Sequence, residues 1–167
     1  MNLLKSNLLL LVAVVLTMSA CSNEDDGIYF DKVNQISELK VEYSEIELEI
    51  LDLINNYRSE RGLNELQTLD FISTIAKTHT TYMLETGLVN HDNFPERNEK
   101  LVTTVGAKNV GENVAYGYYS AQGVFDAWIA SEHHREIIEN DSYTHFGIST
   151  ECNTTGRNYF TQMFIKK

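Results

Sequence analysis

The spacing of apolar residues changes along this chain, from helical in its first half to alternating near its end. Apolar side chains recur at helical spacing from Ile46 to Tyr57, whereas THFGISTE and NYFTQMFIK alternate with a period of two. The segment NTTGR, which joins these two stretches, contains the glycine expected of a hairpin loop. Helices followed by a pair of strands predict an α+β domain in which the helices pack on a small antiparallel sheet.

Local signals mark both ends of the first helix. Ser44 is followed three residues later by Glu47, which is the spacing of a capping box. Gly62 supplies the left-handed residue that commonly ends a helix. These signals predict a helix over 45–61.

A second helix is predicted to begin near Asp70 and to end at Gly87. His79 lies on the apolar stripe of this helix, so we expect a buried histidine in the core, with its hydrogen bonds satisfied. Residues 88–119 contain regularly placed glycines and read as irregular, apart from a short helix around 96–104. Irregular segments of this kind often carry functional sites.

The second half of the chain contains two serines that can begin helices, Ser120 and Ser131. Trp128 lies on the apolar stripe of the first of these helices and is predicted to belong to the core, as is Tyr159. His145 opens a strand on the face opposite its apolar neighbour, so we expect it to be exposed.

The N-terminus, MNLLKSNLLLLVAVVLTMSAC, has the three parts of a signal peptide: the positive charge of Lys5, an apolar run, and the small residues Ser19 and Ala20. The apolar run is too short to cross a membrane as a helix. We therefore predict a signal peptide over 1–20. The small pair before Cys21 resembles the lipobox of bacterial lipoproteins, which implies lipidation of Cys21 and anchoring in a membrane. Ordinary signal cleavage beside a cysteine is the alternative.

Residues 21–43 are mixed and acidic, without a sustained helical or strand period, and are predicted to be a tether. The acidic cluster EDD at 24–26 resembles signals that direct lipoproteins to the outer face of the cell envelope, which implies an outer-membrane or surface location. A merely soluble linker is the alternative. The tether leaves 44–167 as one compact domain.

Charge and cysteine content restrict the classes of function. The net charge of −11 disfavours binding to nucleic acid or to bare anionic lipid surfaces. If Cys21 is lipidated, Cys152 has no cysteine left to pair with. The domain must therefore be held together by its core, without a disulfide framework.

Four stretches, AKTHTTYMLETGLVNH, GENVAYG, AWIASEHHREII and NYFTQMF, resemble the CAP superfamily in their order and spacing. This superfamily is also called the SCP or PR-1-like family, and the resemblance is to its bacterial form. It spans about residues 46 to 165. It implies a three-layer α-β-α sandwich with a cleft on one side, formed by a CAP domain over 44–167.

The resemblance also implies a set of cleft residues. The family's first cleft histidine matches His91, and the glutamate of its GEN motif matches Glu112. The histidine of the bacterial S-x-x-H-R motif matches His134. Two family positions differ here, since Ser131 replaces a glutamate and Tyr159 replaces a histidine.

His133 and His134 are adjacent on a predicted helix, so their side chains diverge by about 100° and cannot face the same way. We expect His134 to face the cleft and His133 to face solvent.

The three cleft residues permit several chemistries. His91, Glu112 and His134 supply two imidazoles and a carboxylate, which is enough for an open zinc site with water as the fourth ligand. Without metal, Glu112 could instead orient one imidazole ring. A third possibility is purely structural, with Glu112 and Asn113 holding the backbone of a polar loop.

Two functions follow from these possibilities. One is a non-enzymatic, envelope-anchored module that binds a lipid, glycan or protein partner through the cleft. The other is a metal-dependent hydrolase, of the peptidase type, that uses Glu112 with His91 and His134. The first is preferred because a hydrolase would need a further carboxylate as base, and no serine, cysteine or threonine has a family-supported base beside it.

Overall fold

The computed structural model describes residues 40–167. The predicted signal peptide, the predicted lipidation site Cys21 and most of the predicted tether lie outside the described residues. Five helices are described: α2 (Glu45–Glu60), α3 (Asp70–Thr86), α4 (Phe94–Val105), α5 (Ala121–Ala130) and α6 (Glu132–Glu139). Four strands are described: β1 (Gln67–Thr68), β2 (Asn109–Tyr116), β3 (His145–Cys152) and β4 (Asn158–Lys166).

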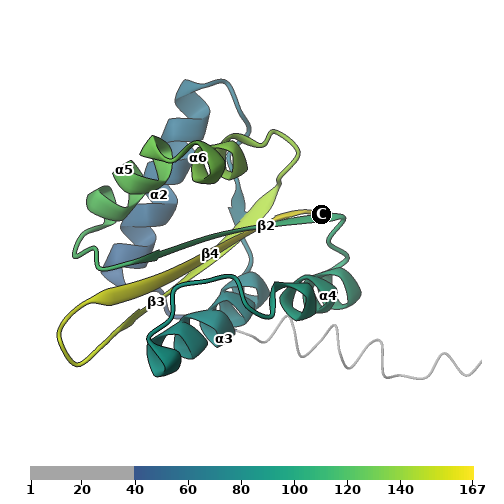
Figure 1. The fold of residues 1–167 in the computed structure, drawn as a ribbon. Coiled ribbons are helices and arrows are strands. Elements are labelled where there is room, and N and C mark those ends of the chain that lie inside the picture. Colours follow the sequence, from purple (N-terminus) through teal and green to yellow (C-terminus); the bar gives the residue numbers. More distant parts are fainter. Residues whose placement is uncertain (1–39) are drawn as a thin grey trace, which may run out of the picture.

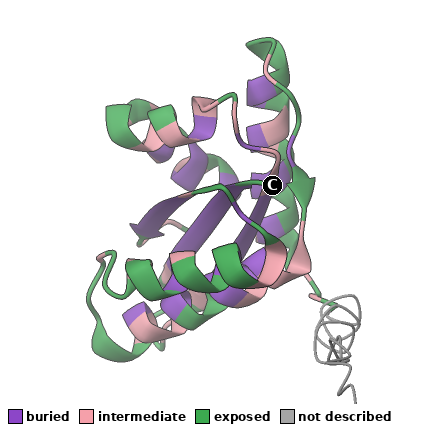
Figure 2. Ribbon diagram, turned by 90° about the vertical axis from the view of Figure 1, so that its right-hand side faces the viewer, coloured by how far each residue is buried: buried purple, intermediate pink, exposed green. Residues whose placement is uncertain are grey.

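The helices cover both faces of one sheet, as the resemblance implied. Figure 1 shows α2, α5 and α6 above the sheet and α3 and α4 below it, which is a three-layer α-β-α arrangement. We call these two sides of the sheet the α2 face and the α3 face. Figure 2 shows that the sheet is buried between the layers, whereas the helices expose their outer sides to solvent. No helix within residues 40–167 is long and apolar enough to cross a membrane.

The predicted helix ends are confirmed by local geometry. Ser44 and Glu47 form the capping box, in which the backbone N–H of Ser44 donates to Glu47 Oε2 at 2.8 Å; the Ser44 hydroxyl also donates to this oxygen, at 2.8 Å. The other oxygen of Glu47 accepts the backbone N–H of Thr150 at 2.6 Å, which ties α2 to β3. Gly87 ends α3 in the left-handed conformation, with φ of 69°.

The predicted hairpin is also confirmed, because β3 and β4 pair in antiparallel fashion from His145 opposite Ile165 to Cys152 opposite Asn158. Two strands were missed. The short strand β1 pairs with β3 in parallel, so the sheet is mixed, with the order β1-β3-β4-β2.

The strand β2 corrects the prediction that this segment is irregular. It pairs with β4 along its whole length, from Asn109 opposite Lys166 to Tyr116 opposite Tyr159. Its residues are buried on both faces between Gly111 and Ala115. The sequence therefore lacks the polar and apolar alternation that reveals a strand with one solvated face.

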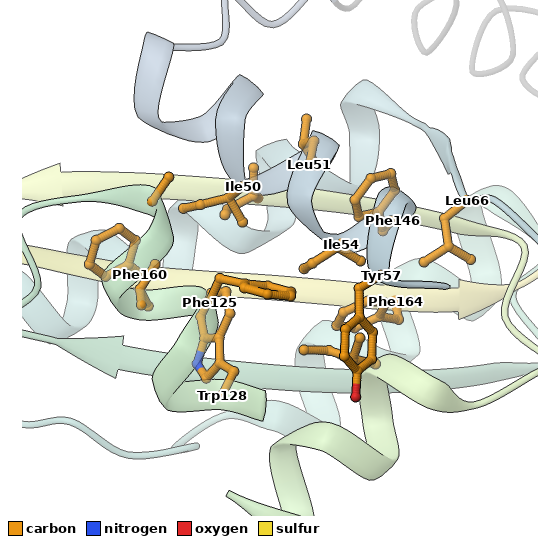
Figure 3. Packing of buried hydrophobic residues seen from close by; sticks show 14 of the residues in the cluster. Ile50, Leu51, Ile54, Tyr57, Leu66, Phe125, Trp128, Phe146, Phe160 and Phe164 are labelled. Atoms are coloured by element: carbon orange, nitrogen blue, oxygen red, sulfur yellow. The ribbon is translucent and has the colours of Figure 1, made fainter. Parts of the chain in front are cut away.

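The core lies on both faces of β4. Phe160 and Phe164 pack on the α2 face together with residues of α2 and α5, shown in Figure 3. The labelled helical residues there are Ile50, Leu51, Ile54, Tyr57, Phe125 and Trp128. Met163 and Ile165 pack on the α3 face. Trp128 and Tyr159 are buried as predicted, but His145, expected to be exposed, is half-buried.

The folded part extends slightly into the predicted tether. The backbone N–H of Val41 donates to Asp70 Oδ2 at 3.1 Å. The hydroxyl of Tyr43 lies 3.2 Å from Asp70 Oδ1 and 2.8 Å from Ser73 Oγ. These contacts attach residues 41–43 to the start of α3.

Candidate functional site

The strand β2 forms one edge of the sheet, and a pocket of about 300 Å³ opens beside its first half. Residues of four other segments complete the pocket: the loop after α3, the start of α4, α6, and the loop between α6 and β3. The lining residues are His91, Phe94, Val110, Gly111, Glu112, His133, Ile137 and Tyr143.

Glu112 lies in the middle of β2 and is only 4% exposed. Its register partner on β4 is Met163, so its side chain is on the α3 face, beside α4. Arg97 of α4, also 4% exposed, donates from Nε to Glu112 Oε2 and from Nη2 to Glu112 Oε1, each at 2.7 Å. This is a buried, bidentate ion pair.

Two opposing effects act on the pKa of Glu112. Burial raises the pKa, because it disfavours the charged carboxylate. Hydrogen bonds from His91 and Arg97, together with the charge of Arg97, outweigh burial and bring the pKa below its ordinary value. The carboxylate is therefore ionised at neutral pH.

His91 Nδ1 lies 2.8 Å from Glu112 Oε1. Since an ionised carboxylate has no proton to donate, Nδ1 carries the proton and donates this hydrogen bond. The His91 side chain is 46% exposed. In the neutral ring, Nε2 is left as a hydrogen-bond acceptor for a molecule in the pocket.

The loop that carries His91 is held by contacts from both neighbouring helices. His79 Nε2 lies 2.7 Å from the carbonyl oxygen of Asn90, and the Tyr82 hydroxyl donates to Asp92 Oδ2 at 2.8 Å. Arg97 Nη1 donates to the carbonyl of Asp92 at 2.7 Å. Arg97 therefore both neutralises Glu112 and positions the loop.

His79 is buried, as predicted, at 1% exposed. Burial is the main cause that lowers its pKa, so the ring is neutral at neutral pH. The prediction that its hydrogen bonds are all satisfied is only half right, because Nδ1 has no partner.

The two adjacent histidines lie in different pockets. His133 is exposed and lines the pocket of His91 and Glu112, although we expected it to face away from the cleft. His134 is half-buried and lines a neighbouring pocket of about 410 Å³ with Ser131 and Trp128. The side chains diverge as predicted, but both lie along the edge of β2.

The electrostatic surroundings keep His134 neutral. Burial is the main cause that lowers the pKa of His134, and repulsion from the neighbouring rings of His133 and His91 lowers this pKa further. The backbone of His134 is tied to the sheet, because Asn113 Nδ2 donates to the His134 carbonyl at 3.2 Å. Asn113 thus joins α6 to β2, whereas Glu112 binds side chains and holds no loop backbone.

The side chains at the site do not match the needs of a divalent metal ion. Both oxygens of Glu112 are taken by the Arg97 guanidinium, which would also repel a metal cation. Within residues 40–167, no group of three or more histidine, cysteine, aspartate or glutamate side chains is arranged to hold a metal ion. In this arrangement, His91, Glu112 and His134 do not fit a shared metal.

Sequence reasoning missed Arg97. It lies in the charged run ERNEK, where a solvated side chain is the ordinary expectation. A signal was present, since Arg97 is three residues after Phe94 and four before Leu101, on the inward stripe of α4. A charged residue at an inward position needs a buried partner.

Tyr143 and Gly111 were also missed as parts of the pocket. A Cβ atom at Gly111 would lie 2.5 Å from the Tyr143 hydroxyl and 3.0 Å from Ile137 Cγ2. Only glycine lets these two side chains approach β2 this closely. Burial raises the pKa of Tyr143, so its hydroxyl stays protonated at neutral pH.

Comparison with known proteins gives a family match and a fold match. The family model of the cysteine-rich secretory protein family (CAP) matches residues 51–164. The uncharacterized membrane protein YlbC of Bacillus subtilis is 32% identical over 124 residues, which are 72% of this chain. The matched region is 34% of that relative, so this chain spans about a third of its length.

Two solved structures share the fold. An outer surface protein from Borrelia burgdorferi has a TM-score of 0.68 at 23% identity, over 77% of this chain and 97% of that one. An extracellular protein containing an SCP domain from Bacillus anthracis has a TM-score of 0.64 at 23% identity, over 77% of this chain and 45% of that one.

Proposed function

Because the chain belongs to the cysteine-rich secretory protein (CAP) family, we propose that it is an extracytoplasmic binding domain that holds a neutral ligand beside His91 and Glu112, without a metal ion. The observation that carries this proposal is the closed network of Arg97, Glu112 and His91 at the pocket. Both carboxylate oxygens are engaged, so Glu112 is neither a free base nor a free metal ligand.

The pocket walls favour an uncharged ligand. Phe94, Val110 and Ile137 are apolar, and the charge of Glu112 is compensated by Arg97. A charged ligand would lose its hydration there without gaining a free opposite charge. Hydrogen-bonding groups for a neutral ligand come from His91, His133 and Tyr143.

The cellular location rests on the N-terminal sequence and on relatives. We propose that the domain is exported and held at the cell envelope by lipidated Cys21. The names of three relatives describe a membrane protein, an outer surface protein and an extracellular protein, which supports this location. The acidic charge of −11 argues against nucleic acid as the partner.

Thermal unfolding with and without zinc tests the proposal against the alternative, a metal-dependent hydrolase. We expect zinc to leave the Tm of the wild type and of Glu112→Gln unchanged. Glu99→Gln, an exposed position on α4 with the same change of charge, is the matched control. A zinc-dependent rise in Tm that Glu112→Gln alone removes, together with cleavage of a peptide library, would show that the site is a metal hydrolase.

Ligand binding needs its own measurement. Neutral amphiphiles, neutral glycans and envelope proteins can be screened by the shift in Tm that each produces. We expect any ligand of the site to lose affinity in His91→Ala, an exposed change that leaves the core intact. Binding that is unaffected by His91→Ala would contradict the assignment of this pocket.

A further inference from the structure

The two pockets beside β2 both take lining residues from three segments: β2, α6 with its N-cap, and the loop after α3. On β2, the first pocket is lined by 110–112 and the second by 114–116. On α6 and its N-cap residue, the first pocket is lined by His133 and Ile137, and the second pocket by Ser131 and His134.

On the loop after α3, His91 lines the first pocket and Val89 lines the second. Gly111 and Ala115, at the middle of each β2 stretch, are four residues apart. At about 3.3 Å per residue, these two residues are roughly 13 Å apart along the strand. The pockets therefore lie one after the other along the edge of β2.

The second pocket has aromatic walls that are held in place. Trp128 Nε1 donates to the carbonyl of Val114 at 3.2 Å, which fixes the indole ring. Asn158 Nδ2 donates to the backbone carbonyl of Tyr118 at 3.0 Å, which fixes the backbone that carries this residue. The ring of Tyr116 packs against Tyr159, with centroids 4.4 Å apart. Rings that are already fixed lose little freedom when a ligand binds.

Apolar groups are also exposed at this end of the edge. Val89 and Tyr116, which line the pocket, are 44% and 36% exposed. Exposed apolar and aromatic groups gathered around a pocket are typical of a binding surface.

Apart from the histidines, the one acidic or basic side chain that lines either pocket is Glu112, and its charge is compensated by Arg97. Neither pocket therefore offers a free carboxylate, lysine or arginine to a charged ligand, which favours a neutral occupant. Hydrogen-bonding groups line the second pocket together with the aromatic rings, including Ser131 and the ring of His134. A ligand that matches both features has apolar faces and hydroxyl groups at its edges, which describes a pyranose sugar.

We infer that the two pockets are subsites of one groove, and that this groove binds a linear, neutral oligosaccharide. The inference deepens the proposed function and rests on it. A single acyl chain would leave the polar groups of the groove without partners. An extended peptide that pairs with β2 is disfavoured, because the Val114 carbonyl already accepts the indole N–H of Trp128.

Trp128 is the single tryptophan in the sequence and lines the second pocket, so its fluorescence reports on the groove. The purified protein is titrated with β-1,4-linked oligomers of glucose and of N-acetylglucosamine, from the monosaccharide to the hexasaccharide. We expect the affinity to rise at least about tenfold with oligomer length, because only longer chains reach both subsites.

Variants separate the two subsites. Tyr118→Ala removes an aromatic wall, and Val89→Glu places a charge on the exposed rim of the second pocket without touching the core. Both should abolish the dependence on length. Tyr119→Ala, which is exposed nearby but outside the lining, should preserve it. His91→Ala should weaken binding of every oligomer.

Three outcomes would overturn the inference: no binding of either oligomer series, equal affinity for monosaccharide and hexasaccharide, or tight binding of an extended peptide or a neutral detergent instead. If a ligand other than a saccharide binds and His91→Ala removes that binding, the oligosaccharide inference fails while the proposed function stands. If His91→Ala changes the binding of no ligand, both fail.

Discussion

Replacing Arg97 by methionine removes the cation that holds Glu112 and keeps most of the side-chain volume. Both residues are 4% exposed and are joined by two hydrogen bonds of 2.7 Å. Removing one partner of a buried ion pair costs about 3–5 kcal/mol, because the remaining charge stays buried without compensation. Since His91 still donates to Glu112, we expect a loss of about 3 kcal/mol in the free energy of unfolding.

The loss should depend on pH, with a sign set by Glu112. In the wild type, the depressed pKa of Glu112 contributes stability above the ordinary value of 4.5, and this contribution disappears as the pH falls through the folded-state pKa. In Arg97→Met, burial, which raises the pKa, is opposed chiefly by His91, so the carboxyl binds a proton at a higher pH. The difference between wild type and variant should therefore shrink as the pH falls below 4.5.

Urea unfolding at pH 7 and at pH 4, followed by the fluorescence of Trp128, measures both effects. Lys100→Met, on the exposed side of the same helix, is the control for loss of a positive charge. The double variant Arg97→Met/Glu112→Met should recover part of the stability, because it leaves no unpaired charge. A loss below about 1 kcal/mol, or an equal loss at both pH values, would refute the buried pair.

Two further substitutions test the packing around the groove. Trp128→Ala should lower the free energy of urea unfolding by about 3–5 kcal/mol, because the side chain is 1% exposed and its indole N–H donates to the Val114 carbonyl. A loss below about 1 kcal/mol would contradict its place in the core. Gly111→Ala should cost about 1–3 kcal/mol, because the new methyl would lie 2.5 Å from the Tyr143 hydroxyl. Adding Tyr143→Phe should restore part of that stability, because Ile137 Cγ2 at 3.0 Å and Tyr143 Cζ at 3.1 Å stay close to the methyl; no recovery would mean that the hydroxyl is not the cause.

Local signals predicted most of the secondary structure because they act between near neighbours. Ser44 and Glu47 are one turn apart, so the capping box could be read before any tertiary contact was known. The hairpin of β3 and β4 was predicted for a similar reason, since a short loop joins two alternating segments. The strand β2 was not predicted, because it is buried on both sides and shows no alternation.

The family motifs located His91 and Glu112, and the structure brings them within hydrogen-bonding distance. The angle between His133 and His134 also followed from helical geometry. The sequence did not show which of the two histidines shares a pocket with His91, because that depends on how α6 lies on the edge of β2.

Arg97 shows most clearly why the site could not be predicted in full. The sequence places this arginine on the inward stripe of α4, but its partner Glu112 lies fifteen residues later, on a different element. The two meet only because α4 packs under the sheet beside β2. Helix ends and strand periods depend on neighbouring residues, whereas the charge balance of a buried site depends on which distant side chains the packed layers bring together.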